Sequence, residues 1–156
     1  FSARLSQQAA KSASIVDAGS YISLNCVYSK RDDPDAELVL KGCDELQPID
    51  TVSAKDYAEQ YQGNAFKADE RFKDSYIVVF GNVTQRSKLI DGQDYIDLEA
   101  QKDFSSVTAI LSPEARAMSD ENGKIGEMAV MLCVGGYRYN EAGSVGLNQC
   151  KYLQNY

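Results

Sequence analysis

The middle of the chain alternates between apolar and polar side chains in the way that is typical of β-strands. Within residues 95–99, Ile96 and Leu98 alternate with polar positions, which predicts a strand that turns these two side chains toward a core and the others toward solvent. The apolar run 76–84 predicts another strand, in which Gly81 indicates a bulge or a sharp bend. The same criteria predict three further strands, over residues 106–111, 127–139 and 144–153.

Helical periodicity occurs at two places among these strands. Ser53 is a favourable N-cap for a helix over residues 54–67. The apolar stripe of this helix has the spacing i, i+4, i+8 and i+11, and consists of Tyr57, Tyr61, Ala65 and Ala68. Phe72 is expected to pack where the chain turns after the helix. Residues 113–118 predict a short helix, because a proline suits the first helical turn.

The elements follow one another as helix, three strands, short helix and two strands. This order predicts a mainly β fold of the α+β class: a five-stranded OB-fold barrel with a helix before strand 1 and a short helix between strands 3 and 4. We expect the barrel to occupy residues 51–156. Residues 1–50 are expected to form an N-terminal segment that is stapled by a disulfide and packed on the barrel.

The patterns within this N-terminal segment are weaker. Residues 3–13 are rich in Ala, Gln and Ser and predict a weak helix. Residues 21–28 fit either a strand or a helix. Residues 31–35 have the composition of a turn.

The four cysteines form two pairs, Cys26 with Cys43 and Cys133 with Cys150, each separated by 17 positions. A hairpin turn centred after Glu141 would set Cys133 opposite Cys150, at a distance that a disulfide accepts. The same register sets Leu132 beside Lys151, unless a bulge near Gly135-Gly136 shifts the pairing. Four cysteines allow three connectivities, and we predict Cys26–Cys43 with Cys133–Cys150; the alternative is buried free thiols.

Two disulfides would place the protein in an oxidising compartment. The chain starts at Phe1, without a methionine or a charged-then-apolar leader, and we interpret it as an exported protein whose signal has been removed. The predicted location is the periplasm, either free or as a membrane-anchored lipoprotein.

The charge balance bears on the kind of ligand. The chain of 156 residues has a net charge of −7, and acidic residues outnumber basic ones both before and after residue 50. Such a charge repels polyanions, whereas grooves for single-stranded nucleic acids are typically positive. The bulk electrostatics therefore disfavour nucleic acid as a partner.

The composition also argues against catalysis. The chain contains no histidine, so it offers neither a Ser–His or Cys–His dyad nor a histidine metal site. The cysteines lack the C-x-x-C spacing of zinc ribbons. Asp97 and Glu99 are explained by a solvated strand face, and Asp32, Asp33 and Asp35 lack the other ligands of an EF-hand loop. We predict that the protein is not an enzyme and uses no cofactor and no metal.

Several short motifs occur in a characteristic order along the chain. They are Ser53-Ala54, the segment YQGNAFKAD over 61–69, Phe72-Lys73-Asp74, Phe80-Gly81-Asn82-Val83, Gly126, Cys133-Val134-Gly135 and Val145-Gly146-Leu147-Asn148-Gln149-Cys150. In this order they resemble the tRNA-anticodon-binding-like (tRNA_anti-like) OB-fold family of small exported bacterial lipoproteins, with the first 50 residues outside the match. The resemblance implies an OB-fold in a periplasmic or membrane-tethered lipoprotein, with nucleic-acid binding inferred by fold analogy only. It supplies no catalytic residues. No lipidation cysteine stands at the start of the sequence, so a membrane link would need an anchor before Phe1.

A ligand surface is predicted where OB-folds bind, on the strand 2–3 face and the loops between strands 1 and 2 and between strands 4 and 5. The candidate residues, two aromatic–cation sets expected to stack bases and touch phosphates, are Arg86, Lys88, Tyr95, Tyr137, Arg138 and Tyr139. We expect Arg86 and Lys88 in the first of these loops. The predicted function is a non-enzymatic binding or interaction module of the bacterial envelope. The alternatives are an envelope assembly protein that binds another protein through residues 1–50, and a single-stranded nucleic-acid binder.

Overall fold

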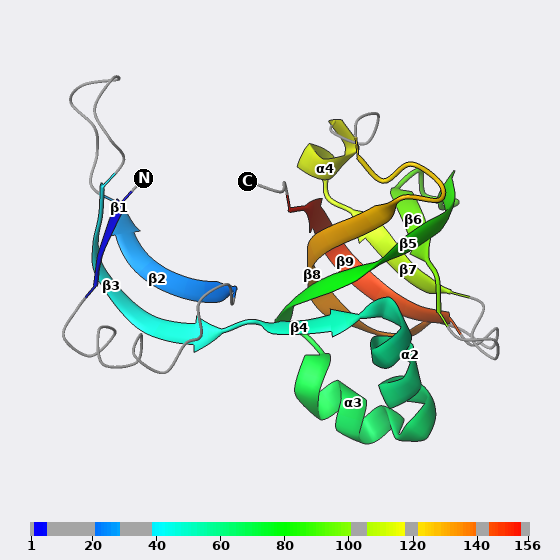
Figure 1. Cartoon of the computed structure of the whole chain (residues 1–156), viewed down its shortest axis with the longest axis horizontal. Coiled ribbons are helices and arrows are strands. Elements are labelled where there is room, and N and C mark those ends of the chain that lie inside the picture. Colours follow the sequence, from blue (N-terminus) through cyan, green and yellow to red (C-terminus); the bar gives the residue numbers. More distant parts are fainter. Residues whose placement is uncertain are drawn as a thin grey trace. The chain divides into compact units, whose positions relative to one another are not determined.

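The computed structural model describes residues 2–5, 21–28, 39–100, 106–117, 122–139 and 144–153 (Figure 1). The chain divides into two compact units, Phe1–Ile49 and Asp50–Tyr156. In the first unit the strands are described through their backbone pairing. The second unit carries the described core and all the hollows discussed below.

The first unit is a three-stranded sheet built from β1 (Ser2–Leu5), β2 (Ile22–Tyr28) and β3 (Val39–Pro48). β3 lies in the middle, parallel to β1 and antiparallel to β2. The prediction of a helix from residue 3 is therefore wrong at its start, where pairing with β3 overrides a weak local preference. The choice left open for residues 21–28 is decided in favour of a strand. The remainder of the predicted helix and the turn at 31–35 lie outside the described residues.

The backbone register of β2 and β3 bears on the first cysteine pair. Asn25 pairs with Asp44 and Val27 pairs with Lys41, with an irregularity between them. Cys26 therefore lies across from the short stretch that contains Cys43. Their side chains lie outside the described residues, so the Cys26–Cys43 bridge stays a prediction.

The second unit contains a closed barrel of five strands: β5 (Tyr76–Lys88), β6 (Asp94–Leu98), β7 (Val107–Leu111), β8 (Met128–Tyr139) and β9 (Ser144–Tyr152). The strands follow the order β5-β6-β7-β9-β8, and β8 pairs back onto β5 to close the barrel. β7 and β9 are parallel, and α4 (Pro113–Ala117) lies in the connection between β7 and β8. The predicted OB-fold barrel with its short helix between strands 3 and 4 is confirmed.

An additional short strand, β4 (Asp50–Ser53), pairs in parallel with the start of β5 and was not predicted. It is held by Arg71, whose Nε donates to Asp50 Oδ2 at 2.8 Å. The same guanidinium donates to Gln60 and lies 4.8 Å from the ring centre of Phe72. One side chain thus joins the edge strand to both helices that follow it.

The helix predicted over residues 54–67 is instead two helices, α2 (Ala54–Gly63) and α3 (Ala65–Phe72). Asn64 ends the first and caps the second, since its Oδ1 accepts from the backbone N–H of Lys67 at 3.1 Å. The predicted N-cap of the first helix is confirmed, because Ser53 Oγ accepts from the Asp56 N–H at 3.0 Å. The chain turns between the helices, so that Phe72 as well as Tyr57 and Tyr61 is fully buried.

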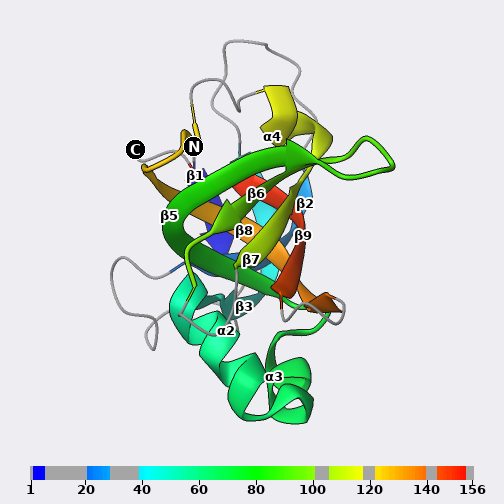
Figure 2. The same cartoon turned by 90° about the vertical axis from the view of Figure 1, so that its right-hand side faces the viewer.

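These helices cover one end of the barrel, opposite the end that carries α4 (Figure 2). Tyr61 Oη donates to the Gly136 carbonyl at 2.9 Å, and Tyr57 Oη donates to the Gly146 carbonyl at 3.4 Å. Burial raises the pKa of both tyrosines, that of Tyr57 to about 12. The hydroxyls therefore stay protonated and act as buried donors to β8 and β9.

Close approach at this end explains the two adjacent glycines of β8. A Cβ on Gly135 would lie 1.9 Å from the carbonyl oxygen of Phe72, and a Cβ on Gly136 would lie 2.2 Å from that of Gly146. The pairing of β8 with β9 shifts between Gly135 and Arg138, near the predicted bulge. No larger residue fits where the helix and the neighbouring strand come this close.

The disulfide Cys133–Cys150 is confirmed and lies buried between β8 and β9. Leu132 does pair with Lys151, as the unshifted register requires, and the strands are irregular just after it. This pairing does not bury the lysine, because Leu132 is only half-buried and Lys151 is exposed. The core is completed by inward residues such as Ile96 and Leu98, which are fully buried as predicted.

Candidate ligand-binding surface

A shallow groove of about 360 Å³ lies on the outer face of β5, β6 and β7. We call it the strand face. Its lining is Thr84, Gln85, Leu89, Tyr95, Asp97, Ser106, Thr108 and Ser144. Gln85 pairs with Asp97 across β5 and β6, and Asp97 pairs with Thr108 across β6 and β7, so these three side chains form one row across the barrel.

The row is linked by hydrogen bonds. Thr108 Oγ1 donates to Asp97 Oδ1 at 2.7 Å, and Thr84 Oγ1 donates to the Asp97 carbonyl at 3.2 Å. Gln85 Nε2 lies 3.4 Å from Tyr95 Oη and donates to it. Tyr95 and Asp97 are both half-buried, whereas Ser106 and Thr108 are buried. The strand face therefore presents hydroxyl, amide and carboxylate groups in a fixed arrangement on rigid strands.

Arg86 and Lys88 do not belong to this surface. They lie in β5 and not in the loop between strands 1 and 2, so that part of the prediction is wrong. Arg86 pairs with the inward Ile96, whereas Tyr95 pairs with Ser87. Because neighbouring strand residues point to opposite faces, Arg86 and Tyr95 lie on opposite sides of the sheet.

The cause is a bulge in β5. Val83 pairs with Leu98, and the pairing then shifts so that Gln85, not Thr84, faces Asp97. Plain alternation from the inward Val83 would have turned Arg86 outward. The extra residue places Thr84 and Gln85 on the outer face together and turns Arg86 to the inner side. On this side, burial raises the pKa of Tyr152. The positive charge of Arg86 has a smaller effect in the opposite direction.

Lys88 is engaged by an acidic neighbour. Its Nζ lies 3.5 Å from Oδ1 of Asp94, which is the residue of β6 that pairs with Lys88. Asp94 also forms an ion pair with Arg116 of α4. This cluster fastens the start of β6 to the short helix, which is a structural role.

The backbone of the other three candidates lies at the end of β8, where Arg138 pairs with Val145 and Tyr139 pairs with Ser144. Ser144 also lines the strand face. The side chains of Tyr137, Arg138 and Tyr139 lie outside the described residues, so their role stays a prediction. Tyr95 is the predicted candidate that the structure places on the strand face.

Sequence reasoning did not single out Gln85 and Thr108, which line the strand face. Gln85 lies outside the predicted strand, because the apolar run that predicted it ends at Thr84, whereas β5 continues to Lys88. The signal for Thr108 was present: Ser106 and Thr108 are polar positions two apart in a predicted strand, as an outward row requires. Asp97 was recognised only as part of a solvated face.

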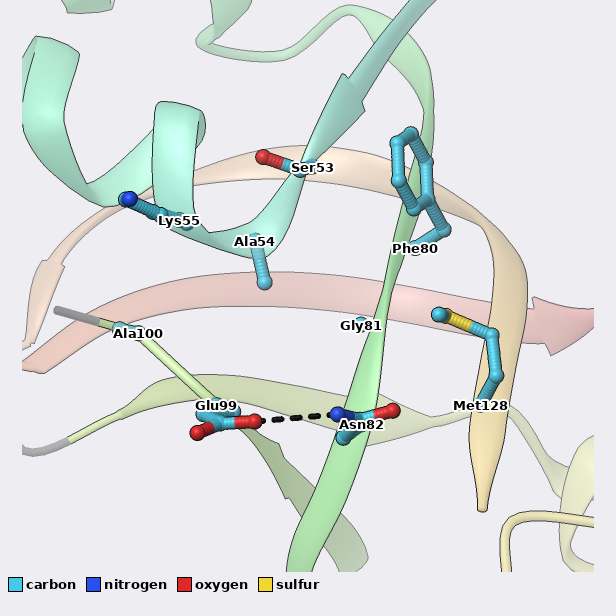
Figure 3. Close-up of a pocket in the computed structure, with 9 residues that line it drawn as sticks. All are labelled: Ser53, Ala54, Lys55, Phe80, Gly81, Asn82, Glu99, Ala100 and Met128. Atoms are coloured by element: carbon cyan, nitrogen blue, oxygen red, sulfur yellow. Dashed lines mark hydrogen bonds between the residues drawn. The ribbon is translucent and has the colours of Figure 1, made fainter.

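A second hollow, of about 440 Å³, lies at the start of α2 (Figure 3). We call it the helix groove. It is lined by Ser53, Ala54, Lys55, Phe80, Gly81, Asn82, Glu99, Ala100 and Met128. Phe80 and the exposed Met128 form an apolar side, and Asn82 Nδ2 donates to Glu99 Oε2 at 3.1 Å on the polar side.

Gly81 keeps the helix groove open. A Cβ there would lie 3.0 Å from Cβ of Ala54. The predicted bulge at Gly81 falls instead between Val83 and Gln85, and the pairing of Gly81 itself with β8 is regular. The glycine is therefore needed for close approach of the helix rather than for a bulge.

A third hollow, of about 730 Å³, lies near α4 and the second half of β9. Its cations face acidic partners: Arg116 pairs with Asp94, and Lys151 Nζ lies 3.8 Å from Glu114 Oε2. Hydrogen bonding by Ser112 and the nearby Lys151 lower the pKa of Glu114, so its carboxyl is charged at neutral pH. We regard these contacts as surface ion pairs that hold α4 in place.

Comparison with known proteins agrees with the barrel fold. The tRNA_anti-like family model matches residues 6–151, so the expectation that the first 50 residues lie outside the family is wrong. A solved structure of a putative nucleic acid-binding lipoprotein from Klebsiella pneumoniae subsp. pneumoniae MGH 78578 matches with a TM-score of 0.52 and 15% identity. The match covers 68% of this chain and 92% of that one, and at this identity it shows the fold alone. No curated protein matches the chain.

Among the described residues, no helix has the length and apolar character needed to cross a membrane. Within the same part of the chain, no group of three or more Cys, Asp or Glu side chains is placed to hold a metal ion.

Proposed function

The chain belongs to the tRNA_anti-like family, and from this premise we propose that it is a non-enzymatic binding module of the bacterial cell envelope that holds its ligand on the strand face. The observation that carries the proposal is the position of this groove. It lies over the second and third strands of the barrel, where OB-folds bind oligonucleotides and oligosaccharides. The barrel, residues 51–156, would be the binding domain, and residues 1–50 an accessory segment.

The arrangement of the strand face supports binding rather than catalysis. Gln85, Asp97 and Thr108 come from three adjacent strands and are already linked to neighbours by hydrogen bonds. A ligand would meet groups whose orientation is fixed beforehand, which lowers the entropic cost of association. The disulfide Cys133–Cys150 supports an exported location, because such bonds persist in oxidising compartments.

A second candidate is an envelope assembly protein that binds another protein. The apolar side of the helix groove favours it, since Met128 is 60% exposed beside Phe80. Protein binding through residues 1–50 is part of the same hypothesis. Binding of single-stranded nucleic acid, with Tyr137, Arg138 and Tyr139 extending the strand face, is the third.

The test is a set of ¹H–¹⁵N NMR titrations with two classes of ligand, single-stranded oligonucleotides and neutral oligosaccharides. The proposed function requires that at least one class shifts the side-chain amide of Gln85 and the backbone amides of Tyr95 and Thr108. Shifts confined to Phe80, Met128 and their neighbours would assign the ligand to the helix groove and contradict the proposal. Absence of shifts with both classes would also contradict it.

A further inference from the structure

The charges of the strand face decide between classes of ligand. Among the described residues that line it, Asp97 is the one acidic side chain, and none is a Lys or an Arg. The two cations of β5 are on the other side of the sheet, and Lys88 faces Asp94 there. A polymer of phosphodiesters needs Lys or Arg at its phosphates, because that contact supplies much of the affinity. The strand face offers a phosphate a carboxylate instead.

The neutral groups of the strand face suit a different chemistry. Thr84, Ser106, Thr108 and Tyr95 carry hydroxyls, which both donate and accept hydrogen bonds. Gln85 adds an amide with the same dual capacity, and Asp97 adds acceptors. Neighbouring hydroxyls of a sugar likewise donate and accept, so this mixture is complementary to a polyol and not to a polyanion.

Tyr95 provides the apolar part of such a site. It is half-buried in β6, flanked by Gln85, whose amide holds the phenol oxygen. An aromatic face is electron-rich, and the C–H face of a pyranose ring packs against it favourably. A fixed aromatic ring beside a row of hydrogen-bonding side chains therefore matches both faces of a sugar unit.

We infer that the ligand of the strand face is an uncharged oligosaccharide, with one sugar ring on Tyr95 and its hydroxyls bound by Gln85 and Asp97. The inference rests on the proposed function and names the ligand class for the same surface. The groove has a volume of about 360 Å³, which is enough to take a sugar unit on Tyr95. The net charge of −7 has no effect on a neutral ligand, whereas it opposes a polyanion.

The experiment uses the whole chain and four neutral probes: maltohexaose, cellohexaose, chitohexaose and a β-1,3-linked glucose hexamer. Each is titrated into ¹⁵N-labelled protein at about 50 and 200 mM salt, beside dT12 and rU12. We expect at least one sugar to shift the Gln85 side-chain amide and the amides around Tyr95 and Thr108, with an affinity that does not change with salt. Binding by the oligonucleotides is expected to be weaker and to fall as salt rises.

Matched variants separate the contributions. Tyr95→Ala is expected to weaken sugar binding by about tenfold, while Tyr95→Phe keeps the ring and most of the affinity. Tyr76→Ala removes a tyrosine of β5 that is 60% exposed and outside the strand face, and should leave binding unchanged. Asp97→Asn keeps an acceptor for Thr108 but removes the negative charge. It should strengthen binding of dT12 or rU12 severalfold and leave sugar affinity the same or lower.

The outcomes distinguish the two proposals. Oligonucleotide shifts on the strand face without sugar shifts would overturn the inference and leave the proposed function standing. Silence from every probe would overturn both. Sugar shifts elsewhere on the protein, or sugar binding that survives Tyr95→Ala unchanged, would overturn the inference. The spectra themselves report whether each variant is folded.

Discussion

Tyr57 allows the buried hydroxyls between helix and barrel to be tested by pH. Its side chain is 0% exposed. Its hydroxyl accepts a hydrogen bond from the Gly136 N–H at 3.3 Å and donates one to the Gly146 carbonyl. Burial raises its pKa from 10.0 to about 12. Because the folded state has the higher pKa, the associated stability is fully present below pH 10 and is lost as the pH rises toward 12. A shift of two units corresponds to ~3 kcal/mol in the free energy of unfolding.

The variant Tyr57→Phe removes both the hydrogen bonds and the titration. Near pH 8 it should be less stable than the wild type by ~1–3 kcal/mol, because the buried Gly136 N–H loses its partner. Between pH 10 and 12 the wild type should lose the additional stability that the variant never had. The two stability curves are therefore expected to converge, and the wild-type advantage to vanish near pH 12.

The assay is urea unfolding followed by circular dichroism at intervals from pH 8 to 11.5, with Tyr76→Phe as an exposed control. Titrating groups away from Tyr57 affect both proteins equally and cancel in the difference between them, whereas Tyr61 does not cancel, because Tyr57 contributes to its raised pKa. Parallel curves for the wild type and Tyr57→Phe over this range would refute the reasoning, since they would mean that the hydroxyl does not titrate differently in the folded state. The control should follow the wild type throughout.

Three further predictions concern the framework that supports the strand face. Gly135→Ala should lower the free energy of unfolding in urea titrations by at least ~3 kcal/mol, because its Cβ would lie 1.9 Å from a backbone carbonyl oxygen. The control Gly63→Ala, whose Cβ would meet nothing within 4 Å, should be neutral or stabilising by up to ~1 kcal/mol. The double variant Cys133→Ala/Cys150→Ala should lose ~2–4 kcal/mol relative to the oxidised protein, and equal stability of the two would contradict a structural disulfide. Asn64→Ala should cost ~1 kcal/mol by removing the cap between the two helices, and an unchanged urea midpoint would show that the cap contributes nothing.

The parts of the fold that depend on local pattern could be predicted from the sequence. Alternation placed Ile96 and Leu98 in the core, and the cap at Ser53 set the start of α2. The strand β4 could not be predicted, because its four residues acquire their conformation from pairing with β5. The break at Asn64 was missed for a related reason. Local periodicity continues through residues 65–68, but burying Phe72 beside Tyr57 requires the chain to turn there.

The candidate site depended on a register that no local pattern determines. Tyr95 was placed correctly because its strand alternates without interruption. Arg86 and Lys88 were assigned to a loop, whereas β5 continues through both, and a single bulge after Val83 turns them to the inner side. Shifting a strand by one residue moves every later side chain to the other face of the sheet. Because of one extra residue in β5, the outer face carries the amide of Gln85 in place of the cations Arg86 and Lys88.

This exchange is also the physical reason to expect a neutral ligand. Without the bulge, residues Arg86 and Lys88 would stand beside Tyr95 and form an aromatic–cation surface of the kind that binds single strands. With it, the cations face Ile96 and Asp94, and Gln85 stands next to Tyr95. The neutral ligand that we infer for this barrel thus depends on the position of one irregularity in β5. For that reason the Gln85 side-chain amide, which is on the strand face only because of the bulge, is the decisive reporter in the titrations.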